Sequence, residues 1–352
     1  MGISDRLLGK KNANGNPRIE VVSPPSALPG GEVRIMGRGL RPAELRQPRV
    51  RFGEIDAAVV ISSDEFVVAR VPEGASSGPV VVATNGHASN AQPIQVAALI
   101  AENLHPVANP AVDTEGNIYA TFSGSRGQKV PVAIFRIDTS YAVKPFVPDM
   151  MNATSITFDR AGQMYVSSRH DGTVYRVAPN AAMSTYAEGM GIATGIAFDK
   201  QENLYVGDRS GTIFKIARDR QIFVFATLEP SVSAYHLAFS PGGDLFVTGP
   251  TTSSFDSVYK IDSHGVVSTF FRGLGRPQGL AFDVEGNLYV AASLSGKRGI
   301  VKITPNGKAS LEVAGTGLVG LAFAPGRSVV LATTNAIHRL SWNIQGWPLV
   351  GE

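Results

Sequence analysis

The stretch GLAFDVEGNLYVA, residues 279–291, reads as a β-strand, a tight turn and a second β-strand. Small and apolar residues form the first half, and Asp, Gly and Asn then supply a turn before an apolar run resumes. Asp283 and Asn287 leave two interpretations open, because both residue types serve in turns and in metal sites. Whether the stretch recurs in the chain distinguishes a scaffold unit from a dedicated site.

Variants of this stretch recur at spacings of about 40 to 46 residues. The six copies are NPAVDTEGNIYAT (109–121), SITFDRAGQMYVS (155–167), GIAFDKQENLYVG (195–207), HLAFSPGGDLFVT (236–248), GLAFDVEGNLYVA (279–291) and GLAFAPGRSVVLA (320–332). Further strand-like segments follow most copies, such as GTVYRVA and STYAEG after the second. Four strands per repeat at this period are typical of the blades of a β-propeller.

The last copy ends in AIHRLSW without a fourth strand, whereas QVAALIAENL (95–104), ahead of the first copy, has the pattern of one. We therefore expect an all-β chain in which residues 98–352 form a six-bladed β-propeller closed by an N-terminal strand. Such closure removes the exposed edges of an open array.

Residues 17–97 carry short alternating strands separated by turn formers, a pattern that predicts a small antiparallel β-sandwich. Three segments in order, SPPSALPGGEVRIMGRGL, VRFGEIDAAVV and VPEGASSGPVVVAT, resemble the IPT/TIG module. This resemblance implies an Ig-like fold. Residues 1–16 are polar and are expected to form a flexible N-terminus.

The repeats resemble NHL-type six-bladed propellers and, more distantly, the gluconolactonase/strictosidine synthase-like propellers. The resemblance implies two classes of function, since propellers host both binding proteins and enzymes. One is a noncatalytic protein that binds a partner protein, a small molecule or a glycan. The other is a lactonase-like hydrolase or a lyase with its active site in the propeller channel.

Composition excludes several classes. A hydrophobic content of 43% excludes a disordered chain, and the absence of cysteine excludes disulfides, thiolate zinc sites and cysteine nucleophiles. The net charge of +3 selects no partner, and the scarcity of aromatic residues in the loops disfavours nucleic acid. No apolar run is long enough to span a membrane, and no signal-peptide pattern opens the chain. As written, the sequence predicts a cytoplasmic protein, or an extracytoplasmic one if the N-terminus was trimmed.

Four of the six turns carry an aspartate at the same place. A calcium loop needs several oxygen ligands from one loop, and each of these turns offers one or two carboxylates. The turn-forming interpretation is favoured, because the fourth and sixth copies use SPGGD and APGRS instead. The four residues are Asp113, Asp159, Asp199 and Asp283.

Propeller topology places the turn of each inner hairpin on one face, and the loops between the second and third strands on the other. We expect a ligand at the second face, where the inner strands begin around the channel. His236 draws attention because it replaces a small residue found in most copies, and a histidine that only fills space is the competing interpretation. The candidate ligand-binding residues are Asn109, Thr154, Thr194, Asp208, Tyr235, His236 and Gln278.

The distant resemblance to gluconolactonases implies a divalent metal in the channel, held by a Glu and by Asn or Asp residues. Thr194 and Gln278 stand where an Asn and an Asp are wanted, and no EGP-like segment supplies the Glu. Hard cations such as calcium are poorly held without carboxylates. We therefore predict no metal and no cofactor, and name no catalytic residue. Calcium enters only with the hydrolase alternative.

Arg169, Arg209 and Arg298 fall in loops of the expected binding face and are candidate rim contacts for an anionic ligand. Acidic residues on the same face nearly balance them, so an ordinary solvated surface is the competing interpretation. Since no complete catalytic constellation is visible, the leading hypothesis is noncatalytic binding.

Overall fold

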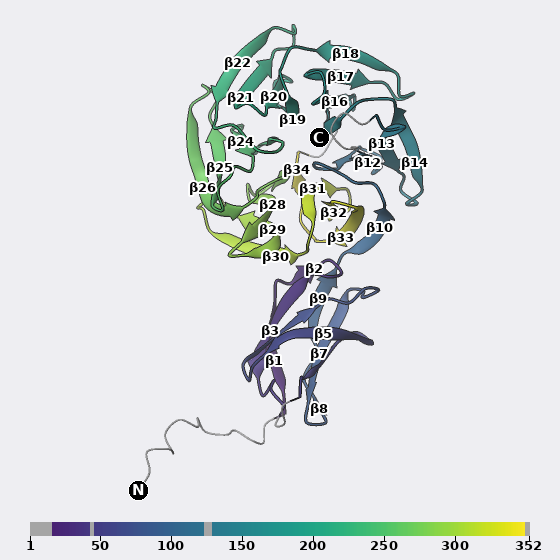
Figure 1. Cartoon of the computed structure of the whole chain (residues 1–352), viewed down its shortest axis with the longest axis vertical. Helices are drawn as coiled ribbons and strands as arrows, with labels where there is room; N and C mark the ends of the chain where they lie inside the picture. Colours follow the sequence, from purple (N-terminus) through teal and green to yellow (C-terminus); the bar gives the residue numbers. More distant parts are fainter. Residues whose placement is uncertain (1–15, 43–45, 123–128, 349–352) are drawn as a thin grey trace. The chain divides into compact units, whose positions relative to one another are not determined.

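The computed structural model describes residues 16–42, 46–122 and 129–348. The expected flexible N-terminus lies outside these ranges apart from residue 16. All regular secondary structure in the described ranges is β-strand, and they hold no helix long and apolar enough to cross a membrane. The chain divides into two compact units, with the first boundary between Ala97 and Ala98; the segment Val313–Gly315 is grouped with the first unit. Figure 1 shows the strands of both.

The first unit is a two-sheet sandwich. Its strands are β1 (Arg18–Ser23), β2 (Ser26–Ala27), β3 (Glu32–Arg38), β4 (Arg49–Phe52), β5 (Ile55–Ser62), β6 (Phe66–Arg70), β7 (Gly78–Thr84), β8 (His87–Ala88) and β9 (Gln92–Val96). Antiparallel pairs join β1, β3, β6 and β5 in that order, and β4, β7 and β9 in that order.

Alternate residues of these strands form the core of the sandwich. Val33 and Ile35 on β3 are fully buried, as are Val67 on β6 and Val80 and Val82 on β7. All five belong to one hydrophobic cluster. The period-two alternation thus places one face of each strand against the opposite sheet.

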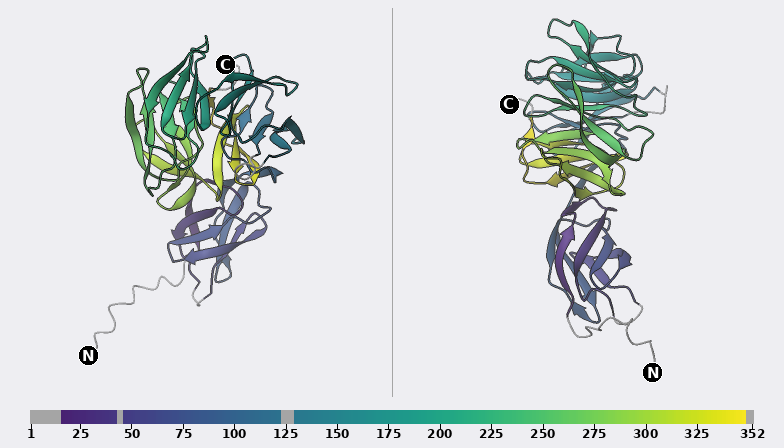
Figure 2. Two further views of the ribbon diagram at one scale, coloured as in Figure 1. Left: turned by 45° about the horizontal axis from the view of Figure 1, so that its top comes forward. Right: turned by 90° about the vertical axis from the view of Figure 1, so that its left-hand side faces the viewer.

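The second unit contains four separate four-stranded antiparallel sheets, which stand side by side around a common centre (Figures 1 and 2). The first three follow the chain: β11 (Ala111–Val112), β12 (Ile118–Thr121), β13 (Val132–Ile137), β14 (Val143–Pro148); β15 (Ala153–Phe158), β16 (Met164–Ser168), β17 (Thr173–Val177), β18 (Met183–Ala187); and β19 (Ala193–Phe198), β20 (Leu204–Asp208), β21 (Thr212–Ile216), β22 (Ile222–Thr227).

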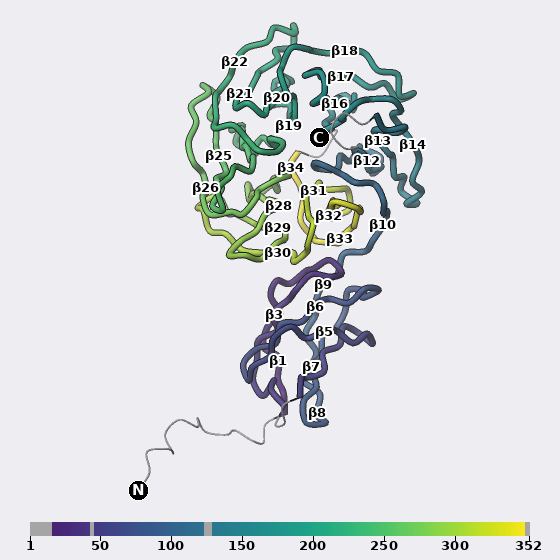
Figure 3. Tube along the Cα trace, in the orientation of Figure 1, coloured from purple at the N-terminus to yellow at the C-terminus, as the bar shows by residue number. Residues whose placement is uncertain are grey.

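The fourth sheet brings together distant parts of the chain. It comprises β31 (Leu318–Ala324), β32 (Ser328–Thr333), β33 (Ala336–Ser341) and, at its outer edge, β10 (Ala98–Glu102). Ala98 pairs with Arg339 and Glu102 with Ala336. Figure 3 shows blue β10 beside yellow β33. The strand ahead of the first repeat therefore completes the last one, as the repeat pattern predicts.

Two further runs of strands pair consecutively, but they do not form sheets of their own. They are β23 (His236–Phe239), β24 (Leu245–Thr248), β25 (Asp256–Ile261), β26 (Val267–Gly275), and β27 (Leu280–Asp283), β28 (Leu288–Leu294), β29 (Lys297–Ile303), β30 (Ala309–Ala314). β26 also pairs with β28, so the two runs belong to one larger sheet. Four of the expected six repeats are thus separate sheets in a propeller-like arrangement.

Aromatic residues at two repeated positions connect neighbouring repeats. The ring on the second strand of one repeat meets, edge to face, a phenylalanine at or next to the end of the inner strand of the following repeat. Centroid separations are 5.6 Å for Tyr119 and Phe158 and 4.9 Å for Tyr165 and Phe198. Such pairs contribute about 0.5–1.5 kcal/mol each beyond the burial of their area. The repeated aromatic letters therefore specify how each repeat packs against the next.

Candidate functional site

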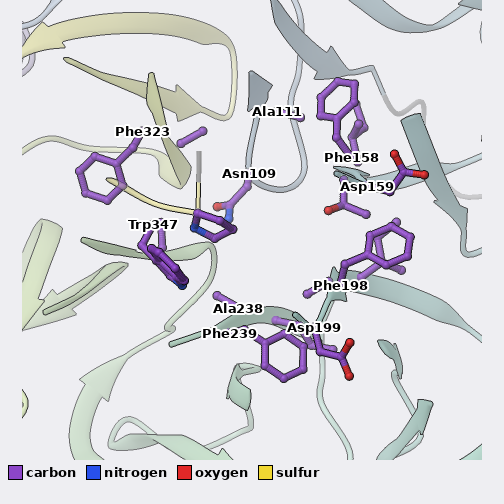
Figure 4. Close-up of a pocket in the computed structure, with 18 of the residues that line it drawn as sticks. Asn109, Ala111, Phe158, Asp159, Phe198, Asp199, Ala238, Phe239, Phe323 and Trp347 are labelled. Carbon is purple, nitrogen blue, oxygen red and sulfur yellow. The ribbon is translucent and has the colours of Figure 1, made fainter. Parts of the chain in front are cut away.

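A cavity of about 830 Å³ lies at the centre of the second unit, between the inner strands β11, β15, β19, β23, β27 and β31. Figure 4 shows part of its lining, with Phe158, Phe198 and Phe239 on one side and Trp347 and Phe323 on another. Pockets for drug-sized ligands typically measure about 300–1,000 Å³. The cavity is therefore large enough for a small organic molecule.

Small residues on the inner strands leave this space open. Each inner strand presents a small side chain to the cavity at the same repeat position: Ala111, Thr157, Ala197, Ala238, Ala281 and Ala322. One residue further on, Phe158, Phe198 and Phe239 are half-buried and also line the cavity. Successive residues of a strand point to opposite faces, so the small residue and the phenylalanine face different neighbouring repeats, as Ala197 and Phe198 do. The phenyl rings also pack against the second strand of the preceding repeat.

Asn109 narrows the channel at the end where the inner strands begin. Its Nδ2 donates to the Leu280 carbonyl at 2.9 Å, and its Oδ1 accepts from the Leu321 amide at 3.1 Å. The side chain lies so close to Gly279 and Gly320 that a Cβ added to either would lie 1.8 or 2.6 Å from Oδ1. Asn109 thus bridges two other inner strands, and both ends of its amide are engaged by backbone.

His236 lines the same end of the cavity. The residue is 4% exposed, and Nε2 has no hydrogen-bond partner among the described residues. Burial lowers the pKa of the imidazole to about 4, so the ring is neutral near pH 7. The cavity therefore offers a ligand no cationic histidine at this end.

The cavity opens toward the turns of the inner hairpins, where Asp113, Asp159 and Asp199 contribute to its lining. These carboxylates are bonded within their own turns. Asp113 accepts from the amides of Glu115 and Asn117 through Oδ1, at 3.0 and 2.8 Å, and from the Tyr119 hydroxyl through Oδ2, at 3.1 Å. Burial, assisted by the Asp113 charge, raises the pKa of Tyr119 to about 12, which keeps this donor protonated.

Asp283 and Asn287 form the same unit in the fifth repeat. Asp283 accepts from the Asn287 amide through Oδ1 at 2.8 Å and from the Asn287 side chain through Oδ2 at 2.7 Å, and Tyr289 donates to Oδ2 at 3.1 Å. Gly286, with φ of +82°, supplies the left-handed residue that the turn requires. These contacts are those of a hydrogen-bonded turn, which is the scaffold interpretation of the motif.

Of the seven residues expected to bind a ligand, Asn109 and His236 line the cavity. The lining includes neither Thr154, Thr194 nor Tyr235, and it extends to the hairpin turns at the face opposite the expected one. Thr154 and Thr194 are each 1% exposed, and their hydroxyls donate to the carbonyls of Asn152 and Gly207 at 3.0 and 2.8 Å. Tyr235 is equally buried and donates its hydroxyl to the Glu229 carbonyl.

Asp208 and Gln278 are likewise held by loop contacts outside the cavity lining. Asp208 accepts from the Ile192 amide at 2.9 Å and from the Ser210 hydroxyl. The Gln278 Oε1 accepts from Arg298 at 2.6 Å. Two of the seven residues thus lie at the cavity, and the side-chain amide of one of them, Asn109, is engaged by backbone groups.

The three candidate rim arginines lie in different surroundings. Arg298 is half-buried, and it donates to the carbonyls of Arg276 at 2.9 Å and of Leu318 as well as to Gln278. Burial lowers its pKa to about 10, so it remains charged near pH 7. Arg209 is exposed and donates to the Ser231 carbonyl at 3.2 Å, and Arg169 donates to Asn152 at 3.4 Å. None of the three lines the cavity.

Sequence reasoning missed the contribution of the C-terminal segment. β34 (Gly346–Trp347) reaches the cavity, and Trp347 and Pro348 contribute to its lining. This segment lies outside the six repeats, so the repeated sequence pattern gives no indication of it. The presence of a tryptophan beyond the last repeat was the available signal.

Comparisons with known proteins address the fold. Residues 17–96 match the family model of the IPT/TIG domain. No curated protein sequence matches the chain.

Solved structures resemble the chain at low identity. A candidate gluconolactonase aligns with a TM-score of 0.59 and 16% identity, over 71% of this chain and 93% of its own. An auxiliary nutrient-binding protein from Bacteroides thetaiotaomicron gives 0.56 and 12%, over 93% and 98%. Virginiamycin B lyase from Staphylococcus aureus gives 0.51 and 15%, over 72% and 87%. At these identities the likeness concerns the fold alone.

Proposed function

We propose that the protein is a noncatalytic binding protein whose central cavity takes a small organic molecule, with the IPT/TIG-like unit as an accessory module. The observation that carries this proposal is the cavity of about 830 Å³, walled by small and aromatic residues. The carboxylates at its open end already accept hydrogen bonds within their turns, which favours binding over acid–base chemistry. Nutrient binding by a protein of similar fold is consistent with this function.

The proposal includes a ring of six blades. The fourth and fifth repeats support it, because β23–β26 and β27–β30 each pair in the blade order despite belonging to a larger sheet. Six inner strands then surround the cavity, one from each repeat.

A neutral fluorescent probe, N-phenyl-1-naphthylamine, tests cavity binding, because its emission rises in apolar surroundings. We expect saturable binding to the full chain. Ala238→Phe, which fills the cavity wall, should weaken it at least tenfold. Thr269→Phe adds the same ring on an exposed position of the outer strand β26 and should leave binding unchanged. Equal binding by both variants, or no binding by the wild-type chain, would contradict the proposal.

A hydrolase or lyase acting in the channel is the alternative. It is favoured by one observation, the neutral imidazole of His236 at the closed end of the cavity. Hydrolysis of a simple aldonolactone, measured with and without EDTA, separates the two functions. Turnover by the wild-type chain that is lost in His236→Leu would replace the binding proposal. A loss with EDTA would add a divalent metal to that alternative.

A further inference from the structure

The C-terminal segment enters the cavity as a short strand. β34 pairs antiparallel with the inner strand β27, with Trp347 opposite Phe282 and Gly346 opposite Asp283. The Val284 amide also donates to the Gln345 carbonyl at 3.1 Å. The segment thus binds the channel-side edge of an inner strand, in the manner of an added peptide strand.

Trp347 is held there much as a bound aromatic ligand would be. Its side chain packs against the hydrophobic cluster that contains Phe282. The Lys200 ammonium lies 5.2 Å from the ring centroid, and Lys200 is oriented by donating to the Pro241 carbonyl at 2.8 Å. An ammonium at this distance from an indole is attracted by the ring. Two contacts from different repeats therefore converge on one indole.

The exposure of the phenylalanines at equivalent repeat positions shows which of them Trp347 covers. Phe282, opposite Trp347, is 2% exposed, whereas the equivalent Phe158, Phe198 and Phe239 are half-buried and line the cavity. Phe323 occupies the same repeat position, lies beside Gly346 of the tail and is 8% exposed. The tail therefore lies against two of the repeated aromatic positions and leaves Phe158, Phe198 and Phe239 accessible; Figure 4 shows these three rings and Trp347.

The tail is attached by few contacts. The amides of Trp342 and Asn343 donate to the Arg327 carbonyl at 3.1 and 3.0 Å, and the described backbone pairing after that point consists of the two residues of β34 and the hydrogen bond at the Gln345 carbonyl. Gly346 lies so close to Phe323 that an added Cβ would be 2.1 Å from the Phe323 Cβ. The strand fits only with glycine at this position.

We propose that the place of the Trp347 indole is a subsite for a planar aromatic group of the ligand, and that the tail competes for it within the same molecule. This inference rests on the proposed binding function. A free aromatic ring can make the same contacts with the Phe282 cluster and with Lys200. A short tether keeps its own group at an effective concentration in the millimolar range, so a ligand must displace it.

Calorimetric titration of the full chain with indole tests this subsite. We expect Trp347→Ala to bind indole at least tenfold more tightly than the wild-type chain, because the subsite is vacated. Trp342→Phe is the matched control: Trp342 lies outside the cavity lining, stacked on Phe323 at 6.4 Å, and its replacement should not change indole affinity. In the Trp347→Ala background, Lys200→Met should weaken indole binding about two- to fivefold.

Gly346→Ala provides a second route to the same result with the indole still present. The added methyl should expel β34, so indole affinity should rise as in Trp347→Ala. In a Trp342→Phe background, where Trp347 is the remaining tryptophan of two, acrylamide should then quench its fluorescence more strongly. If neither variant binds indole more tightly while N-phenyl-1-naphthylamine still binds the cavity, the subsite proposal is wrong and the binding function stands. If neither probe binds any variant, both proposals fall.

Discussion

The two ends of the central channel are built from the same inner strands, yet they differ in what their polar groups contact. Where the inner strands begin, the side chains of Asn109 and Thr194 form hydrogen bonds with backbone groups outside their own strands, and this end of the channel is packed. At the turns, Asp113 and Asp283 bind their own turns, and the space between the strands remains open. The contacts of Asn109 join different repeats at the packed end, whereas those of the aspartates at the open end stay within one turn.

The largest effect is expected from adding a methyl group at the packed end. A Cβ at Gly320 would lie 2.6 Å from Asn109 Oδ1 and 2.7 Å from the Asn109 nitrogen. Gly320→Ala should therefore lower the free energy of unfolding by about 3 kcal/mol, as overpacking against backbone does. Ala322→Ser, two residues along the same strand and facing the cavity, should change it by less than about 0.5 kcal/mol. Urea unfolding that gives equal losses would remove the distinction between the two ends.

Acid should destabilise the protein through its buried histidines. Burial lowers the pKa of both His236 and His338 to about 4, below the usual 6.5. The unfolded chain thus binds these protons first as pH falls. The stability they contribute is complete above about pH 6.5 and is lost as pH falls toward 4, by roughly 2 to 3 kcal/mol each.

Urea unfolding between pH 7 and 4 measures this loss. His236→Leu should reduce the loss of unfolding free energy between pH 7 and 4 by the contribution of one histidine. His338→Leu, on β33 outside the cavity lining, should reduce it by a similar amount. An unchanged slope in either variant would show that folding does not lower the pKa of the imidazole in question.

The loop arginines should separate into a structural residue and a surface residue. Arg298→Ala removes several hydrogen bonds to carbonyls from a half-buried guanidinium, and should cost about 2 kcal/mol. Arg209→Ala removes one contact of an exposed side chain and should cost less than about 0.5 kcal/mol. Thermal unfolding checks both. A similar loss for each would mean that exposure does not separate their roles.

The smallest effect is expected at the open end. Tyr289→Phe removes one hydrogen bond to Asp283, which should cost about 1 kcal/mol. The double variant Asp283→Ser with Tyr289→Phe should cost less than the sum of the single changes, because the two residues act as a unit. Strict additivity in urea unfolding would show that each contributes separately.

Much of the fold follows from the repeated letters, since turn formers and alternating apolar residues specify local hairpins. The pairing of β10 with β33 also follows, because an unmatched strand and an incomplete repeat stand at opposite ends of the array. The sequence also contains a repeated Asp–Tyr pair, which was not used when the Asp residues were interpreted as turn formers. Asp and Tyr six residues apart occur together, and the fourth repeat replaces both, with Ser240 and Phe246.

The position of the cavity could not be predicted in the same way. It depends on Asn109 reaching two strands that lie more than 160 residues away in the chain, and on glycine where those strands pass it. The tail that lines the cavity belongs to no repeat, so no period indicates its register on β27. Three-dimensional proximity, rather than local pattern, decides both features.

The closure of the last repeat by β10 also has a consequence in time. During synthesis β10 emerges early, while its partner β33 is made only after most of the second unit. At about 5–20 residues per second, β10 waits on the order of ten to fifty seconds with one edge unpaired. Until β33 is made, the last repeat cannot be completed. The growing chain meanwhile exposes a strand edge to other nascent chains on the same messenger RNA. The order of translation, and not the stability of any one repeat, therefore sets the period in which this protein is most exposed to misassembly.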